Sequence, residues 1–171
     1  VYFGFDNPMD NWTWNVAWFS DPVFLGEYPK EGLEKFAPYL PEITKEDMEL
    51  IHQPLDFMGQ NIYNGYMIRC GKDGEPEYVD RAPGAAKTGT GWPVTPEALY
   101  YGIRFLTERY HLPLYITENG MSDLDNISAD GQVHDSERIT FLDAYLGAVQ
   151  RAVNEGMPGR VESYFDNPNT F

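Results

Sequence analysis

Glu118 is the residue whose type and position most directly suggest chemistry. The five residues before it, Pro113 to Thr117, form an apolar and β-branched run that is typical of one buried strand. Asn119-Gly120 follows and predicts a turn. A carboxylate at the C-terminal tip of a strand covered on both faces suits a parallel α/β sheet or barrel, where such tips face the reaction site. The pattern alone leaves open that Glu118 only caps the following loop.

The segments around this strand have the character of helices and a further strand. Thr95 as N-cap and Pro96 at the first helical position predict a helix to about residue 110, which leads into the Glu118 strand. Residues 134–155 predict the longest helix, and residues 55–63 predict another strand. Five apolar residues are expected to form the buried stripe of the longest helix: Ile139, Leu142, Leu146, Val149 and Val153.

The N-terminal third predicts short helices. Trp14 and Trp18 lie four residues apart, as on one helical face, and Asp21-Pro22 is expected to end that helix. A short helix is predicted around residues 31–37. Thr44 is expected to cap the next helix, with Asp47 completing a capping box. Residues 66–69 and 77–79 predict a hairpin, and residues 81–91, rich in Gly, Ala and Pro, predict a mobile surface loop.

Several of these segments share their sequence with one enzyme family. Ile116-Thr117-Glu118-Asn119-Gly120 resembles the nucleophile signature of glycoside hydrolase family 1, the β-glucosidases and 6-phospho-β-glucosidases. Four other segments are similar to family motifs and follow the family's order: Trp18–Pro29 (W-F-x-D-P, then G-x-Y-P), Asp56–Tyr63 (D-F-x-G-x-N-x-Y), Trp92–Leu99 (W-x-x-x-P-x-x-L) and Val133–Arg138 (V-x-D-x-x-R).

The resemblance implies a fold, a reaction and three site residues. The fold is expected to be α/β, a partial (β/α)8 TIM barrel with about three strand–helix units from the second half of the barrel. Glu118 is expected to be the nucleophile of a retaining hydrolase, Tyr63 to hydrogen-bond and orient it, and Asn61 to line the glycone pocket. A phenolic O–H donated to a carboxylate favours its ionised form and fixes its orientation. A strand tyrosine more commonly just packs, and that alternative stands beside the functional one.

Two departures from the family limit this expectation. The family's acid/base glutamate lies in an Asn-Glu-Pro motif, which does not occur here, although retaining hydrolysis needs two carboxyl groups about 5–5.5 Å apart. The family's tail segment W-S-x-x-D-N-F-E-W, which binds sugar hydroxyls, is reduced to Asp166-Asn167. We therefore expect one partial domain over residues 1–171, with the resemblance covering about 1–156 and a divergent segment at 157–171.

Composition sets outer bounds on function. The chain has 171 residues, short for a barrel that typically needs about 250. Its net charge of −15 argues against nucleic acid and anionic membranes as partners. Cys70 is the only cysteine, so no intrachain disulfide forms, and a buried thiol is expected. No signal segment or membrane-spanning run occurs in the sequence, which favours a cytoplasmic location.

The expected function is therefore that of a retaining β-glucosidase acting on terminal β-D-glucosyl residues, without a metal or organic cofactor. The expected partner is a β-glucoside or a short β-linked oligosaccharide. Whether the substrate is a free or a 6-phosphorylated glucoside stays open, although the net acidity disfavours the phosphorylated one. Open sheet edges predict self-association, pairing with a missing N-terminal half, or marginal stability. The alternative is a non-catalytic carbohydrate-binding or interaction fragment of a decayed or split barrel.

Overall fold

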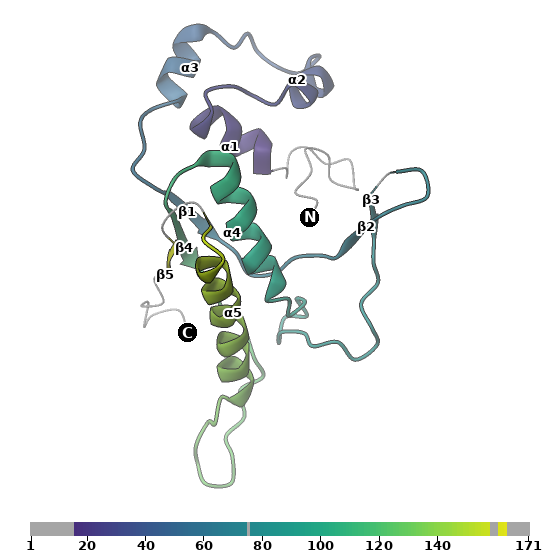
Figure 1. Cartoon of the computed structure of the whole chain (residues 1–171). Helices are drawn as coiled ribbons and strands as arrows, with labels where there is room; N and C mark the ends of the chain where they lie inside the picture. The colour runs from purple at the N-terminus through teal and green to yellow at the C-terminus, as the bar shows by residue number, and fades with distance from the viewer. Residues whose placement is uncertain (1–15, 75, 158–160, 164–171) are drawn as a thin grey trace. The chain divides into compact units, whose positions relative to one another are not determined.

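The computed structural model describes residues 16–74, 76–157 and 161–163 (Figure 1). The chain forms two units. One contains Val1–Asp56 and Ile68–Tyr78, and the other contains Phe57–Met67 and Val79–Phe171. All three candidate site residues belong to the second unit. No helix among the described residues is both long and apolar enough to cross a bilayer.

The second unit contains a parallel sheet of three strands. Its strands are β1 (Met58–Asn61), β4 (Leu114–Glu118) and β5 (Val161–Ser163), in the spatial order β1-β4-β5. Helix α4 (Glu97–Tyr110) connects β1 to β4, and α5 (Ser136–Asn154) connects β4 to β5. Alternating strands and helices around a parallel sheet are the building plan of α/β barrels. In the described part of the chain this plan gives an open sheet instead of a closed barrel.

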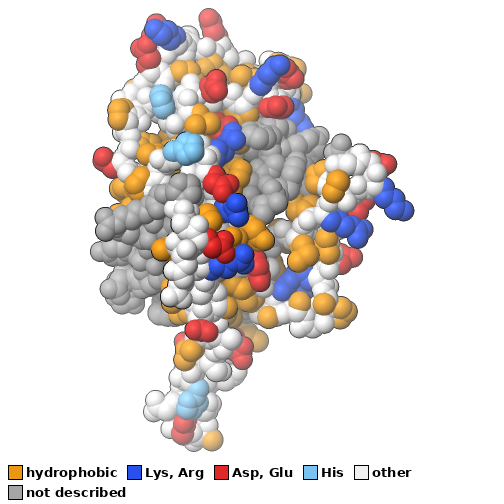
Figure 2. Space-filling view, in the orientation of Figure 1, with side chains coloured by type: hydrophobic (Ala, Val, Ile, Leu, Met, Phe, Trp, Pro, Cys, Tyr) orange, Lys and Arg blue, Asp and Glu red, His pale blue; other side chains and the backbone are white. Residues whose placement is uncertain are grey.

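The core of this unit lies where α4 and α5 pack on each other and α4 packs on β4 (Figure 1). Burial of these apolar side chains is the main force that holds helices and sheet together. The fully or nearly fully buried residues are Met58, Leu99, Tyr100, Ile103, Leu106, Tyr110, Leu114, Ile116, Phe141, Tyr145 and Ala152. The exposed sides of the two helices carry ion pairs, among them Arg104 with Glu108 and Arg151 with Glu155. Figure 2 shows acidic and basic side chains next to each other on this face of the molecule.

The prediction for the buried stripe of α5 was wrong. Phe141, Tyr145 and Ala152 are the residues of this helix that face the core. Four residues of the predicted stripe are exposed instead, namely Ile139, Leu142, Leu146 and Val153. The apolar surface of α5 is wider than its contact with α4, and the sequence periodicity alone does not say which part of that surface is covered. The predicted extent of the helix agrees with the observed one.

The described part of the first unit contains three short helices, α1 (Val16–Phe24), α2 (Lys30–Phe36) and α3 (Lys45–Ile51). The predicted capping box is confirmed, because the Thr44 hydroxyl accepts from the Asp47 amide while the Asp47 carboxylate accepts from the Thr44 amide. The predicted end of α1 at Asp21-Pro22 was wrong. Pro22 lies inside the helix, which continues because the Leu25 amide donates to the Asp21 carbonyl. Trp14 lies outside the described residues.

The predicted hairpin is formed by β2 (Ile68–Cys70) and β3 (Pro76–Tyr78), which pair antiparallel. The prediction that Cys70 is buried was wrong, since its thiol is exposed. These two strands form a sheet of their own, and a two-stranded ribbon leaves its side chains open to water.

Candidate active site

The C-terminal ends of β1 and β4 lie side by side and carry the candidate residues. The two strands run parallel, with Met58 opposite Leu114 and Gln60 opposite Ile116. The register then shifts by one residue, so that Asn61 lies opposite Glu118. Because both strands point the same way, residues that are 57 positions apart in sequence, Asn61 and Glu118, end at the same edge of the sheet.

Tyr63 and Glu118 are joined directly. The phenolic O–H of Tyr63 donates to Oε2 of the Glu118 carboxylate. This hydrogen bond, with smaller contributions from burial and from the negative charge of Glu118, raises the pKa of Tyr63 from 10.0 to about 12. Tyr63 therefore stays protonated at neutral pH and remains a donor. A carboxylate held at one oxygen by such a donor is fixed in direction, while its other oxygen can meet an electrophile.

Asn61 lies next to this pair through its contact with β4. Its side-chain Oδ1 accepts from the Thr117 hydroxyl at 2.6 Å. The side chain is exposed at the sheet edge, so its amide group is accessible to the hydroxyls of a ligand. The structure thus brings all three residues predicted from the sequence together at one place.

Two further hydrogen bonds tie the loops after β1 and β4 to each other. The Ile62 amide donates to the Glu118 carbonyl at 3.1 Å, and the Asn119 side-chain amide donates to the Ile62 carbonyl at 2.7 Å. One backbone hydrogen bond and one from the Asn119 side chain therefore hold the two strand ends together, so the geometry of the phenol–carboxylate pair does not depend on the side chains of Tyr63 and Glu118 alone.

Comparison with known proteins decides the family. The model of glycosyl hydrolase family 1 matches residues 7–167. The chain belongs to glycosyl hydrolase family 1. Its relatives in this family include Beta-glucosidase A of Thermotoga maritima, 38% identical over 154 residues, and a Beta-glucosidase of Agrobacterium sp., 38% identical over 149 residues. These alignments cover 88% and 83% of this chain but 34% and 32% of the relatives, so the chain spans about a third of their length.

Solved structures of the family have the same fold. The beta-glucosidase from Thermotoga maritima in complex with castanospermine superimposes with a TM-score of 0.73 at 37% identity, over 89% of this chain and 34% of that chain. The complex of the same enzyme with deoxynojirimycin gives the same TM-score at 36% identity. The predicted fold, a part of the family's (β/α)8 barrel, is confirmed.

A hydroxyl cluster fastens the loop before α4 to the loop after the Glu118 strand of this family 1 domain. The hydroxyls of Thr88, Thr90 and Ser122 lie in a chain, with 3.1 Å between neighbouring oxygens. The Trp92 amide donates to the Thr88 hydroxyl, and the Trp92 ring meets the Tyr63 ring edge-on with 5.6 Å between centroids. The C-terminal end of the loop of residues 81–91, which was predicted to be mobile, is thus hydrogen-bonded to its surroundings. Trp92, directly after this loop, packs against Tyr63.

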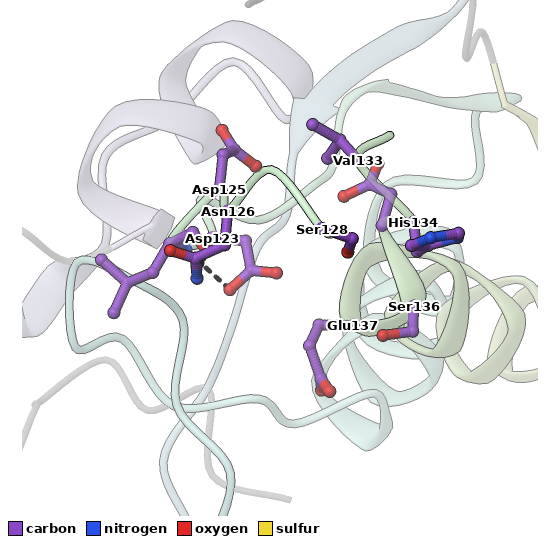
Figure 3. Close-up of a pocket in the computed structure, with 10 residues that line it drawn as sticks. Asp123, Asp125, Asn126, Ser128, Val133, His134, Ser136 and Glu137 are labelled. Carbon is purple, nitrogen blue, oxygen red and sulfur yellow. Dashed lines mark hydrogen bonds between the residues drawn. The ribbon is translucent and has the colours of Figure 1, made fainter. Parts of the chain in front are cut away.

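An acidic cavity of about 340 Å³ lies elsewhere in this unit (Figure 3). It lies at the loop before α5, which extends beyond the N-terminal end of that helix (Figure 1). Asp123 and Asp125 lie on one side of it, and His134 and Glu137 lie on the other (Figure 3). Acidic side chains and a histidine are also seen at the tip of this loop in Figure 2. Glu118, Tyr63 and Asn61 do not line it. In the described part of the chain, no three His, Cys, Asp or Glu side chains are grouped so that they could hold a metal ion.

Arg138 anchors that loop to the helix. Its guanidinium forms ion pairs with Asp125 and with Asp135, the latter at 2.6 Å between Nε and Oδ1. Asp135 and Arg138 are two of the residues in the V-x-D-x-x-R pattern, which gives this family motif a structural role here. The acidic residues are thus partly neutralised by a cation of the same chain.

Sequence reasoning missed several residues that support the site. Thr95 was predicted to cap α4, but the helix begins at Glu97 without a side-chain cap, and the Thr95 hydroxyl accepts from the Gly65 amide at 2.9 Å. Thr117, between two recognised motif residues, gave no signal of its own. Tyr145 gave none either, because a tyrosine in an amphipathic helix is indistinguishable from an ordinary core residue.

Proposed function

We propose that this chain supplies the nucleophile of a retaining β-glucosidase, with Glu118 as the attacking carboxylate. One Glu118 oxygen forms a bond to the anomeric carbon of a β-glucoside, the bond from that carbon to the leaving oxygen breaks, and the leaving group departs with the electron pair. Water later cleaves the glycosyl ester. Tyr63 holds the attacking carboxylate in place, and Asn61 offers its amide to a hydroxyl of the sugar.

The observation that carries this proposal is the phenol–carboxylate pair at the strand ends. Tyr63 donates to Glu118 across neighbouring parallel strands. A carboxylate oriented by a fixed donor at the C-terminal edge of a parallel sheet is suited to nucleophilic attack. The relatives named above are beta-glucosidases, which supports a β-glucoside as the substrate class.

The proton donor for natural substrates is proposed to come from outside these residues. The sequence has no Asn-Glu-Pro motif, and a glucoside with a poor leaving group needs a proton at the leaving oxygen. Complete hydrolysis would thus require an upstream segment that carries this glutamate. Mixing the chain with such a segment from a family 1 relative is expected to produce hydrolysis that neither part shows alone.

The nucleophile can be tested without the proton donor. A 2-deoxy-2-fluoro-β-glucoside with a dinitrophenolate leaving group reacts without protonation, because this phenolate is already a stable anion. Intact-mass measurement is expected to show one fluoroglucosyl group added to the wild-type chain. Glu118→Gln should remain unlabelled, whereas the matched variant Glu137→Gln, which removes an acidic group at the start of α5, should label like wild type.

The result that would contradict the proposal is a folded wild-type chain that stays unlabelled. A β-glucoside can then be titrated into this chain while the amide resonances of the protein are followed. If the chain binds the sugar, the non-catalytic carbohydrate-binding alternative replaces the proposal. Labelling of Glu118→Gln at the wild-type rate would equally remove Glu118 from the reaction.

A further inference from the structure

The short segment Tyr63–Gly65, directly after β1, is held at both ends by residues from other elements. At one end the Tyr145 hydroxyl, on α5, donates to the Tyr63 carbonyl at 2.9 Å. At the other end the Gly65 amide donates to the Thr95 hydroxyl, just before α4, at 2.9 Å. Gly65 also approaches α4 so closely that a Cβ on it would lie 2.8 Å from the Ala98 Cβ. The backbone that carries the Tyr63 phenol is therefore tightly constrained.

Tyr145 is itself held rigidly. Its side chain is completely buried, and its ring stacks on Phe141 with 3.9 Å between centroids and 20° between planes. Its hydroxyl also accepts from the Thr95 amide at 2.8 Å. A tyrosine hydroxyl has one hydrogen to donate, and here that hydrogen goes to the Tyr63 carbonyl while a lone pair receives the Thr95 amide. Burial raises the pKa of Tyr145, so the hydroxyl keeps this hydrogen at neutral pH.

We propose that Tyr145 and Thr95 are positioning residues for the nucleophile, because together they fix the backbone of Tyr63, whose phenol holds Glu118. This inference rests on the proposed role of Glu118. In this segment the hydrogen-bond partners of the two side chains are main-chain groups, the Tyr63 carbonyl and the Gly65 amide, and not the Tyr63 phenol or the Glu118 carboxylate. Both residues therefore act through the main chain of residues 63–65. In a Tyr145→Phe chain the Tyr63 carbonyl and the Thr95 amide lose their partner in a partly buried place, which favours movement of the whole segment.

The direct readout is the environment of the Tyr63 phenol, which needs no turnover. In a chain labelled with carbon-13 at tyrosine Cζ, the Tyr63 signal is the one absent from Tyr63→Phe. Tyr145→Phe and Thr95→Ala are each expected to move this signal towards that of a phenol in water. The matched control is Tyr100→Phe. It removes the hydroxyl of another buried tyrosine, on α4, which donates to Glu155 just after α5, and it should leave the signal in place.

The kinetic readout separates positioning from general loss of stability. Tyr145→Phe should slow labelling by the fluoroglucoside by up to about fivefold, the effect expected when the single hydrogen bond from Tyr63 to Glu118 is lost. In a Tyr63→Phe background the same change should have little further effect, because the residue through which it acts no longer holds the carboxylate. An equal loss in both backgrounds would show a merely structural role.

Each outcome bears on one proposal at a time. An unchanged Tyr63 signal in folded Tyr145→Phe overturns the positioning inference, whether or not the chain is labelled. If Tyr145→Phe does not fold, Thr95→Ala decides, since it releases Gly65 and keeps the buried ring; an unchanged signal there overturns the inference as well. If the two variants shift the Tyr63 signal but the folded wild-type chain is not labelled, the nucleophile proposal is contradicted and the positioning inference stands.

Discussion

Removal of the Tyr63 hydroxyl is the change whose effect can be worked out most fully. Tyr63→Phe keeps the ring and its edge-on contact with Trp92 and deletes only the donor to Glu118. The rise in the pKa of Tyr63 from 10.0 to about 12 corresponds to about 2.7 kcal/mol in favour of the protonated, hydrogen-bonded phenol. Glu118 is exposed, so water screens the pair, and we expect a net contribution of about 1 kcal/mol.

The assay is the rate of labelling by the dinitrophenyl fluoroglucoside. A loss of about 1 kcal/mol lowers a rate roughly fivefold. The fall should appear in the maximal labelling rate and not in the concentration that gives half of it, because the phenol contacts the carboxylate and the proposal gives it no contact with the sugar. Tyr39→Phe, a change at a side chain that is 85% exposed in the other unit, is the control and should label like wild type.

Two results would refute this reasoning. A folded Tyr63→Phe chain that labels at the wild-type rate would mean that the carboxylate needs no orientation from Tyr63. A variant whose maximal rate is unchanged but whose half-saturating concentration rises would place Tyr63 in sugar binding. Either result would show that the hydrogen bond from Tyr63 to Glu118 does not orient the nucleophile for the reaction.

Three further predictions concern stability. The hydrogen bond from Tyr63 to Glu118 should stabilise the fold fully below pH 10 and lose this contribution as the pH rises from 10.0 to about 12, because the pKa of Tyr63 is higher in the folded state than in the unfolded state. The difference in the free energy of unfolding between wild type and Tyr63→Phe, measured in urea, should shrink over that range. Thr44→Ala should remove the cap of α3, costing about 1 kcal/mol and speeding amide exchange in that helix roughly fivefold; unchanged exchange would speak against the capping box. Gly65→Ala should destabilise the fold by about 1–3 kcal/mol, because the new Cβ would lie 2.8 Å from the Ala98 Cβ. Gly147→Ala, on α5 with open space around it, should stabilise the fold by up to about 1 kcal/mol. Shifts of the melting temperature that are equal in the two variants would contradict both expectations.

The meeting of Tyr63 with Glu118 could be predicted from the sequence for a simple physical reason. Parallel strands joined by a helix end at the same edge of a sheet, so two strand tips with polar residues must lie near each other. The family motifs at residues 56–63 and 116–120 then identified Tyr63 and Glu118 as the residues at those strand ends. Thr44 with Asp47 was predictable in the same way, because a capping box is made by residues only three apart and needs nothing from the rest of the chain.

Features that depend on what covers a surface were not predictable from local patterns. The apolar stripe assigned to α5 is largely exposed, since the helix buries a different face, with Phe141 and Tyr145. Pro22 does not end α1, because the carbonyl of the residue before it, Asp21, still accepts a hydrogen bond from the Leu25 amide.

The support of the site was equally hidden from sequence. Thr95 has the residue type of a helix cap, yet its hydroxyl accepts from Gly65, 30 positions away. Tyr145 reaches the Tyr63 carbonyl across 82 positions. Contacts of this kind arise from how α4 packs on α5 and on β4, and no spacing of residue types within either helix predicts them.

The central claim is that Glu118 is the attacking group, and locating the label tests it most directly. The wild-type chain is treated with the dinitrophenyl fluoroglucoside, digested at low pH to protect the ester, and fragmented by tandem mass spectrometry. We predict that the fluoroglucosyl group is found on Glu118, within the peptide that contains β4 and Asn119-Gly120. A label on any other residue, or none on a chain shown to be folded, would contradict the account.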